Sequence, residues 1–271
     1  MIDRREIDLL RSLLQSGAGS PLDALVQQVD GDAEVLAGVI GSLERDGYRF
    51  EKTATTIRLQ AEPDAVRPQS IAARLTTHSI GREVYVFAET TSTNDLARRA
   101  GIGKASEGVV FFAEQQTAGR GTHGRNWVSK ANQGLWFSIL LRSTLAVDQW
   151  PVLVRMAALA AADSAEQWIK GQVGIKPPND LVLGEGKLAG FLLETSNAWN
   201  FQVLGIGVNV RSAPQIEGYP TSALDDFSKI RVSLDALAAQ ILNRFEDWYC
   251  KESIESVNRA FEARVEGSAE R

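Results

Sequence analysis

The segment Gln115–Trp127 reads QQTAGRGTHGRNW and gathers three glycines, two arginines and a tryptophan. Glycines at this density are costly inside a helix, so we expect the segment to be a loop. A guanidinium group matches the oxygens of a carboxylate or a phosphate, and glycine N–H groups can approach an anion closely because no Cβ intervenes. The residue types therefore favour an anion-binding loop, with an ordinary solvated surface loop as the alternative.

Three further polar segments interrupt the apolar pattern, each at a strand end or in a loop. They are Ser92–Asn94 (STN), Lys176–Asp180 (KPPND) and Gly205–Asn209 (GIGVN). The prolines beside Lys176 stiffen its backbone, which favours a functional lysine over an ordinary surface one. GIGVN is not a dinucleotide fingerprint, because it ends in Asn and no helix follows.

Composition excludes several classes of site and of protein. The 271 residues include one cysteine and two histidines, so no internal disulfide can form and no His/Cys metal cluster is available. No apolar run reaches the roughly 18 residues of a membrane helix, and the charged start MIDRREIDLL lacks the apolar stretch of a secretory signal. We expect a cytoplasmic protein without a membrane segment.

The elements that must position these segments alternate along the larger part of the chain. Strands are expected over 108–114 and 134–142, on either side of the arginine loop, and over 201–210. Helices are expected over 93–100, 150–169 and 234–249. Several sheet strands with a few long helices predict an α+β domain.

The first quarter of the chain has a different character. Three short helical patterns, the second with Pro21 at its first position, are followed by an alternating stretch over 48–59, the order of a winged helix-turn-helix. Residues 1–65 hold seven Lys/Arg against twelve Asp/Glu, which accounts for the whole net charge of −5. We predict a winged helix-turn-helix over 1–62, a linker over 63–70 and a larger α+β domain over 71–271.

Taken in order, STN, QQTAGRG, GR-W, K-PND, GKLAG and GIGVN resemble the motifs of a bacterial biotin–protein ligase of the bifunctional kind, which has an N-terminal winged helix. The resemblance implies a class II synthetase-like catalytic domain that uses ATP, Mg²⁺ and biotin. Biotin carboxylate attacks the α-phosphorus of ATP to give biotinyl-5′-AMP. A lysine of the biotin carrier domain of acetyl-CoA carboxylase (the biotin carboxyl carrier protein) then takes the biotinyl group. The resemblance also implies a homodimer formed through a sheet edge.

The resemblance implies functional roles for particular residues of this chain. The residues expected to be catalytic are Lys176, Arg120 and Arg125. The residues expected around biotin are Ser92, Thr93, Asn94, Gln116, Arg120, Gly121, Thr122 and Lys176. The residues expected around ATP or the adenylate are Arg120, Arg125, Trp127, Asn179, Lys187, Gly205, Gly207 and Asn209. Asp180 either contacts Mg²⁺ or caps a turn. The loop is expected to be mobile when empty and to order on ligand binding.

Three departures from the family pattern stand out. Thr122 occupies a position that is usually arginine, and Pro177 one where many members carry tryptophan. After Tyr249 only 22 residues remain, too few for the small SH3-like domain that usually ends the bacterial enzymes, so that domain is expected to be absent.

Two alternatives to the ligase are open. One is a biotin-sensing DNA-binding repressor, in which the larger domain only reads the ligand. Its predicted recognition helix over 32–46 carries a single basic residue, Arg45, and phosphate contacts from Lys and Arg supply most non-specific affinity for DNA. DNA binding is therefore expected to be weak. The other alternative is a lipoate or octanoyl transferase of the same fold, whose RRxxGGG and KxNG segments are missing.

Overall fold

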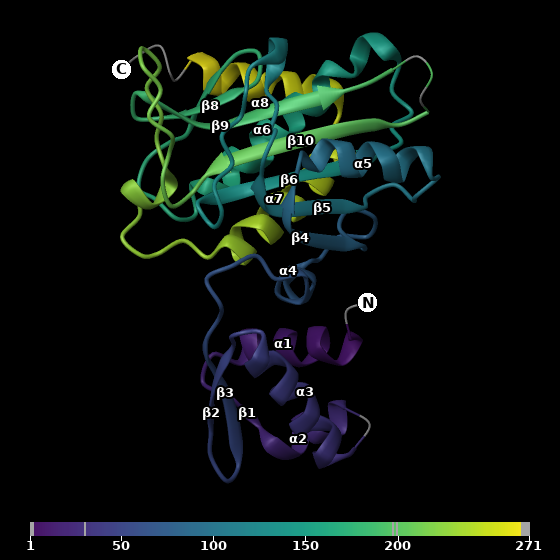
Figure 1. The fold of residues 1–271 in the computed structure, drawn as a ribbon, viewed down its shortest axis with the longest axis vertical. Coiled ribbons are helices and arrows are strands. Elements are labelled where there is room, and N and C mark those ends of the chain that lie inside the picture. Colours follow the sequence, from purple (N-terminus) through teal and green to yellow (C-terminus); the bar gives the residue numbers. More distant parts are fainter. Residues whose placement is uncertain (1–2, 30, 197, 199, 267–271) are drawn as a thin grey trace. The chain divides into compact units, whose positions relative to one another are not determined.

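The computed structural model describes residues 3–29, 31–196, 198 and 200–266. The chain divides into two compact units, Met1–Arg74 and Leu75–Arg271 (Figure 1). In the described residues no helix is both long and apolar enough to span a membrane.

The first unit combines short helices with a small antiparallel sheet. Its elements are α1 (Arg4–Ser16), β1 (Ser20–Pro21), α2 (Leu22–Gln28), α3 (Ala33–Arg45), β2 (Arg49–Lys52), β3 (Thr56–Ala61) and α4 (Pro68–Arg74). Strand β3 lies between β1 and β2. The Asp32 side chain caps α3 by accepting from the backbone N–H groups of Glu34 and Val35. A buried cluster that includes Leu9, Leu43 and Tyr48 holds the helices together.

Two local predictions for this unit differ from the structure. Pro21 was expected as the first residue of the second helix, but it pairs with Thr56 in β1 and the helix begins one residue later. The segment predicted as a linker over 63–70 contains the start of α4. Proline is compatible with a first helical turn, because its missing N–H has no partner there in any helix, and Pro68 occupies that position.

The second unit is built on a seven-stranded mixed sheet. Its strands are β4 (Val84–Thr90), β5 (Val110–Gln116), β6 (Gly134–Leu141), β7 (Gly174–Lys176), β8 (Asp180–Leu183), β9 (Gly186–Glu194) and β10 (Gln202–Asn209). Their order across the sheet is β4-β5-β6-β10-β9-β8-β7. Only β4 and β5 are parallel, so this unit is an α+β fold, as predicted.

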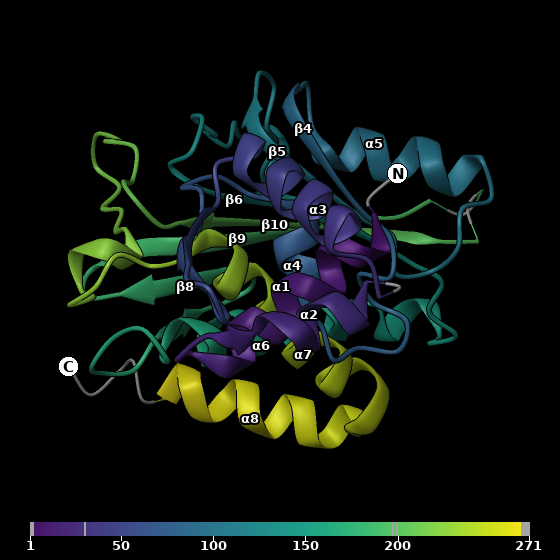
Figure 2. The same ribbon diagram turned by 90° about the horizontal axis from the view of Figure 1, so that it is seen from below.

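Helices cover both faces of this sheet (Figures 1 and 2). Among the described residues, the α-helices of this unit are α5 (Thr93–Ile102), α6 (Pro151–Ala165), α7 (Leu234–Lys251) and α8 (Ile254–Glu266). Helix α5 packs on one face, where Ala97 joins Phe111, Leu140 and Val203 in a buried cluster. Helix α6 is alanine-rich and almost wholly buried between the other face and α7. This arrangement places the start of α5 beside the loop between β5 and β6.

Helix α8 was not predicted. It contacts α6 and β7. The Arg264 guanidinium pairs with Asp163 and Glu166 of the α6 region, and the Arg155 guanidinium lies 5.1 Å from the centre of the Phe261 ring. These contacts are more than 95 residues apart in sequence, so local periodicity does not reveal them.

Candidate functional site

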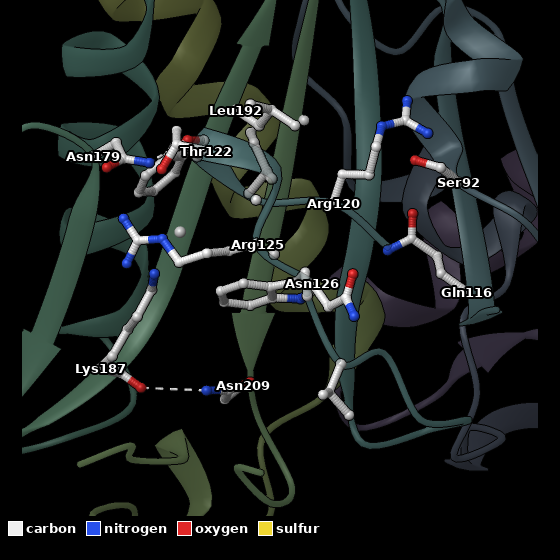
Figure 3. Close-up of a pocket in the computed structure, with 18 of the residues that line it drawn as sticks. Ser92, Gln116, Arg120, Thr122, Arg125, Asn126, Asn179, Lys187, Leu192 and Asn209 are labelled. Atoms are coloured by element: carbon white, nitrogen blue, oxygen red, sulfur yellow. Dashed lines mark hydrogen bonds between the residues drawn. The ribbon is translucent and has the colours of Figure 1, made fainter. Parts of the chain in front are cut away.

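A cavity of about 360 Å³ lies over the sheet, between the start of α5 and the loop Gly119–Trp127 (Figure 3). Among the residues that line it are Ser92, Thr93, Asn94, Gln116, Arg120, Gly121, Thr122, Arg125, Trp127, Asn179, Lys187, Gly205, Gly207 and Asn209. The structure therefore brings most of the sequence-predicted site residues to one place. The cavity has the size and the mixed apolar and polar lining of a small-molecule site.

One end of the cavity is a hydrogen-bonded network of short polar side chains. Gln116 Oε1 accepts from the backbone N–H of Thr93 at 2.8 Å, and Gln116 Nε2 donates to Ser129 Oγ at 2.7 Å. Ser138 Oγ lies 2.8 Å from Thr93 Oγ1 and 2.5 Å from Asn94 Oδ1. These contacts fix the orientation of the Gln116 and Asn94 amides. Ser138 was not predicted, because a lone serine in an apolar strand carries no motif.

Three polar atoms at the cavity have no hydrogen-bond partner among the described residues, although they are buried. They are Asn94 Nδ2, Trp127 Nε1 and Asn209 Oδ1. Asn209 Nδ2 donates to the Lys187 carbonyl at 3.2 Å, which leaves Oδ1 as the free acceptor (Figure 3). An unpaired buried polar atom costs about 1–3 kcal/mol. Two donors and one acceptor are thus available to a ligand.

Two glycines of the sheet, Gly190 and Gly207, form a flat surface under the Trp127 side chain. A Cβ on Gly207 would lie 2.5 Å from the indole, and a Cβ on Gly190 would lie 2.9 Å from it. A Cβ on Gly205 would lie 2.4 Å from Asn94 Oδ1. Gly205 and Gly207 were predicted to admit a nucleotide. Both glycines line the cavity, where the side chains of Asn94 and Trp127 lie directly against them.

Cationic side chains gather at the other end of the cavity around Tyr219. Lys176 Nζ lies 5.6 Å and Lys187 Nζ 5.9 Å from the centre of the Tyr219 ring. Lys187 Nζ is 2.7 Å from Asp180 Oδ1, and the Tyr219 hydroxyl donates to Asp180 Oδ2 at 2.9 Å. Burial and the hydrogen bond to Asp180 raise the pKa of Tyr219, while the positive charge of Arg125 lowers it. Tyr219 was missed, because the stretch after β10 shows no periodicity.

Lys176 and Asp180 lie beside the cavity rather than in its lining. Lys176 is exposed at the end of β7, and Asp180 begins β8. Asp180 binds Lys187 and Tyr219. Neither Lys176 nor Arg125 has a carboxylate partner among the described residues, whereas Lys187 has one. The cationic end therefore retains two uncompensated charges.

Arg120 lines the cavity, as predicted for a site residue, and its guanidinium is bound to carboxylates. Its Nη1 and Nη2 donate to the two carboxylate oxygens of Asp95, both at 3.0 Å. Its Nη2 and Nε also donate to Glu194 Oε1, at 3.0 and 3.2 Å. The hydrogen bonds from Arg120 hold the pKa of Asp95 below its usual range. Arg120 is thus bound to two carboxylates, Asp95 and Glu194.

The backbone of the loop also differs from the expectation. The N–H of Gly121 was expected to face an anion, but it donates to the Arg125 carbonyl at 2.7 Å inside the loop. The loop contains a short turn over Thr122–Gly124, in which His123 and Gly124 have φ values of 57° and 72°. Positive φ at these two residues closes the loop tightly enough for the internal bond to form.

The described residues do not supply a resident Mg²⁺ site. No group of three or more His, Cys, Asp or Glu side chains within the described ranges could hold a metal ion. No carboxylate lines the cavity, and both oxygens of the nearby Asp180 already have partners. Mg²⁺ requires several oxygen ligands in near-octahedral geometry, so these side chains do not form a cage for it.

Comparison with known proteins agrees with this arrangement. Residues 86–210 match the model of the Biotin/lipoate A/B protein ligase family. The biotin–[acetyl-CoA-carboxylase] ligase of Mycobacterium tuberculosis is 37% identical over 193 residues, which cover 68% of this chain and 72% of that protein. The chain belongs to the biotin protein ligase family. The bifunctional ligase/repressor BirA of Bacillus subtilis is 30% identical over 76% of this chain and 62% of its own length.

Solved structures of the family have the same fold. The biotin protein ligase from Leishmania major in complex with biotinyl-5-AMP superposes with a TM-score of 0.61 at 27% identity, covering 69% of this chain and 83% of that one. The ligase from Aquifex aeolicus in complex with biotin and ATP gives a TM-score of 0.57 at 25% identity, covering 68% and 78%.

Proposed function

We propose that this chain is an ATP-dependent biotin–protein ligase that activates biotin as biotinyl-5′-AMP and transfers the biotinyl group to a lysine of a biotin carrier domain. The observation that carries the proposal is the polarity of the cavity. One end presents fixed amides and hydroxyls, and the other gathers cations with uncompensated charge. A ligand that fits these two ends has a neutral hydrogen-bonding group at one end and, at the other, a carboxylate that reacts with a phosphate.

The polar end suits the ureido ring of biotin, which offers two N–H donors and one carbonyl acceptor. Ser92, Thr93 and Gln116 supply hydroxyl and amide groups at this end, and Asn94 Nδ2 supplies an unpaired donor. Because Gln116 and Asn94 are already held by Ser129 and Ser138, they need little reorganisation to bind the ring.

At the cationic end the reaction concentrates negative charge around one phosphorus. A carboxylate oxygen of biotin forms a bond to the α-phosphorus, and the bond from that phosphorus to the departing pyrophosphate breaks. We assign Lys176 and Arg125 to the carboxylate and the α-phosphate, because fixed cations stabilise the charge that develops there. Asn179, Lys187 and Asn209 serve the nucleotide. The free Oδ1 of Asn209 is an acceptor suited to an amine on the base.

In the second step the ε-amine of the carrier lysine attacks the biotinyl carbonyl carbon, and AMP leaves. Mg²⁺ enters with the phosphates of ATP as part of the substrate, in keeping with the lack of a carboxylate cage among the described residues. Thr122 lines the cavity where the family usually has arginine, so retention of the adenylate depends on Arg125 and Trp127.

We further propose that residues 1–62 form a winged helix-turn-helix and that the catalytic unit forms a homodimer through a sheet edge. The order of helices and strands in the first unit supports the winged helix. Two basic residues of the β2–β3 hairpin are already paired, Lys52 with Glu44 at 2.7 Å and Arg58 with Glu51 at 2.6 Å. This pairing favours a module that binds DNA weakly.

The first step is tested by exchange of labelled pyrophosphate into ATP. We expect exchange that depends on added biotin and on Mg²⁺, because formation of the adenylate is reversible. If biotin binds with ordinary affinity but promotes no exchange, the chain is a biotin sensor and the proposed ligase activity is wrong. Exchange driven by lipoate in place of biotin would assign the site to the other branch of the family.

A further inference from the structure

Ser138 places a buried hydroxyl beneath the polar end of the cavity. It lies in β6, is fully buried, and pairs across the sheet with Gly205 of β10. Its Oγ lies 2.5 Å from Asn94 Oδ1 and 2.8 Å from Thr93 Oγ1. Ser138 is not among the described residues that line the cavity, whereas Thr93 and Asn94 are. It can therefore act on a ligand only through these two side chains.

Gly205 allows the Asn94 side chain to reach Ser138. A Cβ on Gly205 would lie 2.4 Å from Asn94 Oδ1, closer than two such atoms can approach. The Asn94 amide thus lies directly on the β10 backbone, beside the cross-strand partner of Gly205. Asn94 is only 4% exposed, and its Nδ2 has no hydrogen-bond partner among the described residues. One end of the amide is bound to Ser138, and the other end is an unpaired donor at the cavity.

A hydroxyl group carries one proton, which limits the direction of these hydrogen bonds. Asn94 Oδ1 can only accept, so the Ser138 proton is directed to it. If that proton turned to Thr93, two oxygens without a proton between them would face each other at 2.5 Å. The Thr93 hydroxyl then donates either to Ser138 Oγ, at 2.8 Å, or to Gln116 Oε1, at 3.2 Å. In both cases Thr93 Oγ1 offers only lone pairs to a ligand.

We propose that Ser138 is a positioning residue that fixes the direction of the hydrogen bonds at this end of the cavity, with Asn94 Nδ2 as a donor and Thr93 Oγ1 as an acceptor. A donor and an acceptor side by side select a ligand group in which a carbonyl oxygen and an N–H are neighbours. The cyclic urea of biotin contains this pair. The identity of the ligand rests on the proposed function, whereas the orientation of the two protein groups does not.

Selection of this kind follows from the free-energy cost of a mismatch. A ligand with an N–H in place of the carbonyl oxygen would face the Asn94 N–H, and both donors would lose their hydrogen bonds to water without replacement. A site built to hydrogen-bond one group therefore rejects an analogue without that group. Without the Ser138 hydroxyl the Asn94 amide can turn over and offer Oδ1 to such a donor. Loss of Ser138 should therefore reduce selectivity.

The test compares wild type with Ser138→Ala in binding biotin and iminobiotin, an analogue in which nitrogen replaces the carbonyl oxygen. Dissociation constants are measured by isothermal titration calorimetry at one neutral pH, where the analogue is protonated and presents only donors. We expect the wild type to favour biotin. Ser138→Ala should bind biotin about five- to tenfold more weakly, with less than about a twofold loss for iminobiotin. Ser138→Cys should behave like Ser138→Ala, because a thiol is a weak donor.

A second measurement needs no ligand. Nuclear spin relaxation of the Asn94 side-chain amide reports how firmly the amide is held. We expect an order parameter of about 0.85 in the wild type and below about 0.6 in Ser138→Ala. Ser164 on α6 supplies a matched control, since it is fully buried and its hydroxyl donates to the Ala160 carbonyl of its own helix at 2.7 Å. Ser164→Ala should change neither the Asn94 amide nor the selectivity.

The role of Ser138 is overturned if Ser138→Ala weakens biotin and iminobiotin by the same factor, or if the Asn94 amide stays rigid in that variant. It is also overturned if the wild type binds iminobiotin as tightly as biotin, since Asn94 would then present Oδ1 to the ligand. A chain that binds neither compound would contradict the proposed function. The relaxation measurement would still decide the role of Ser138, because a looser Asn94 amide in Ser138→Ala supports it and a rigid one overturns it.

Discussion

Charge is unevenly compensated among the four cationic residues of the site. Arg120 meets two carboxylates and Lys187 meets one, whereas Lys176 and Arg125 meet none among the described residues. A cation without a carboxylate partner binds an incoming phosphate most strongly, because no existing ion pair has to be broken first. At the scale of single residues, Lys176 and Arg125 are therefore the groups on which we expect the chemical step to depend.

Lys176→Ala tests this assignment. We expect adenylate formation to slow by about 10²–10³-fold, the usual effect of removing one fixed electrostatic contact to a transition state. The rate is measured by pyrophosphate release in a single turnover. Lys170→Ala removes another exposed lysine of the same unit and should leave the rate unchanged. A Lys176→Ala rate within a few-fold of wild type would remove Lys176 from the mechanism.

At the scale of the strands, β9 and β10 need glycine where the Trp127 indole packs directly against their backbone. Gly207→Ala is expected to displace Trp127, since the new Cβ would lie 2.5 Å from the indole. We expect weaker nucleotide binding and faster exchange of the Trp127 amide. The matched control is Gly38→Ala on α3, where the added Cβ meets nothing within 4 Å. Unchanged nucleotide affinity in Gly207→Ala would contradict the role assigned to this surface.

The buried carboxylate of Glu246 on helix α7 accepts hydrogen bonds from the segment that precedes β4. Burial alone would raise the pKa of Glu246, but backbone N–H donors of Ile80, Ser79 and His78 outweigh it and lower the pKa from 4.5 to about 2. The folded-state pKa lies below the unfolded one, so this stabilisation is complete above pH 4.5 and is lost as the pH falls toward 2.

The corresponding prediction concerns Glu246→Gln. The free energy of unfolding is measured with urea at several pH values for the wild type and the variant. Between pH 4.5 and 2, the wild type should lose roughly 3 kcal/mol more of its free energy of unfolding than Glu246→Gln does. Identical pH profiles for the two proteins would show that Glu246 does not anchor α7 through its charge.

Local patterns in the sequence predicted the elements better than the contacts between them. The strands on either side of the arginine loop and the alanine-rich helix α6 follow from periodicity and composition. Helix α8 and the partners of Arg120 do not, because their contacts join residues 25 or more positions apart. Motif resemblance assigned Arg120 to the ligand, which stays a prediction, and a motif fixes residue types without revealing that Glu194 at the end of β9 pairs with this guanidinium.

At the scale of the whole molecule, acidic charge is concentrated in one part of the chain. Residues 1–65 hold twelve Asp/Glu against seven Lys/Arg, while the remainder is neutral. We predict that the chain binds duplex DNA weakly, because few phosphate contacts are available to an acidic module. A gel shift with its own promoter region at physiological salt checks this. Tight, sequence-specific binding would contradict the prediction and favour a bifunctional ligase and repressor.

In the proposed reaction, this cavity joins biotin to a protein lysine, and ATP is cleaved to AMP and pyrophosphate. The most direct measurement incubates the purified chain with labelled biotin, ATP, Mg²⁺ and a purified biotin carrier domain of acetyl-CoA carboxylase, and follows the mass of the carrier. The account predicts addition of one biotinyl group to one carrier lysine, only when ATP is present. A carrier whose mass stays unchanged, with an enzyme that still binds biotin and ATP, would contradict it.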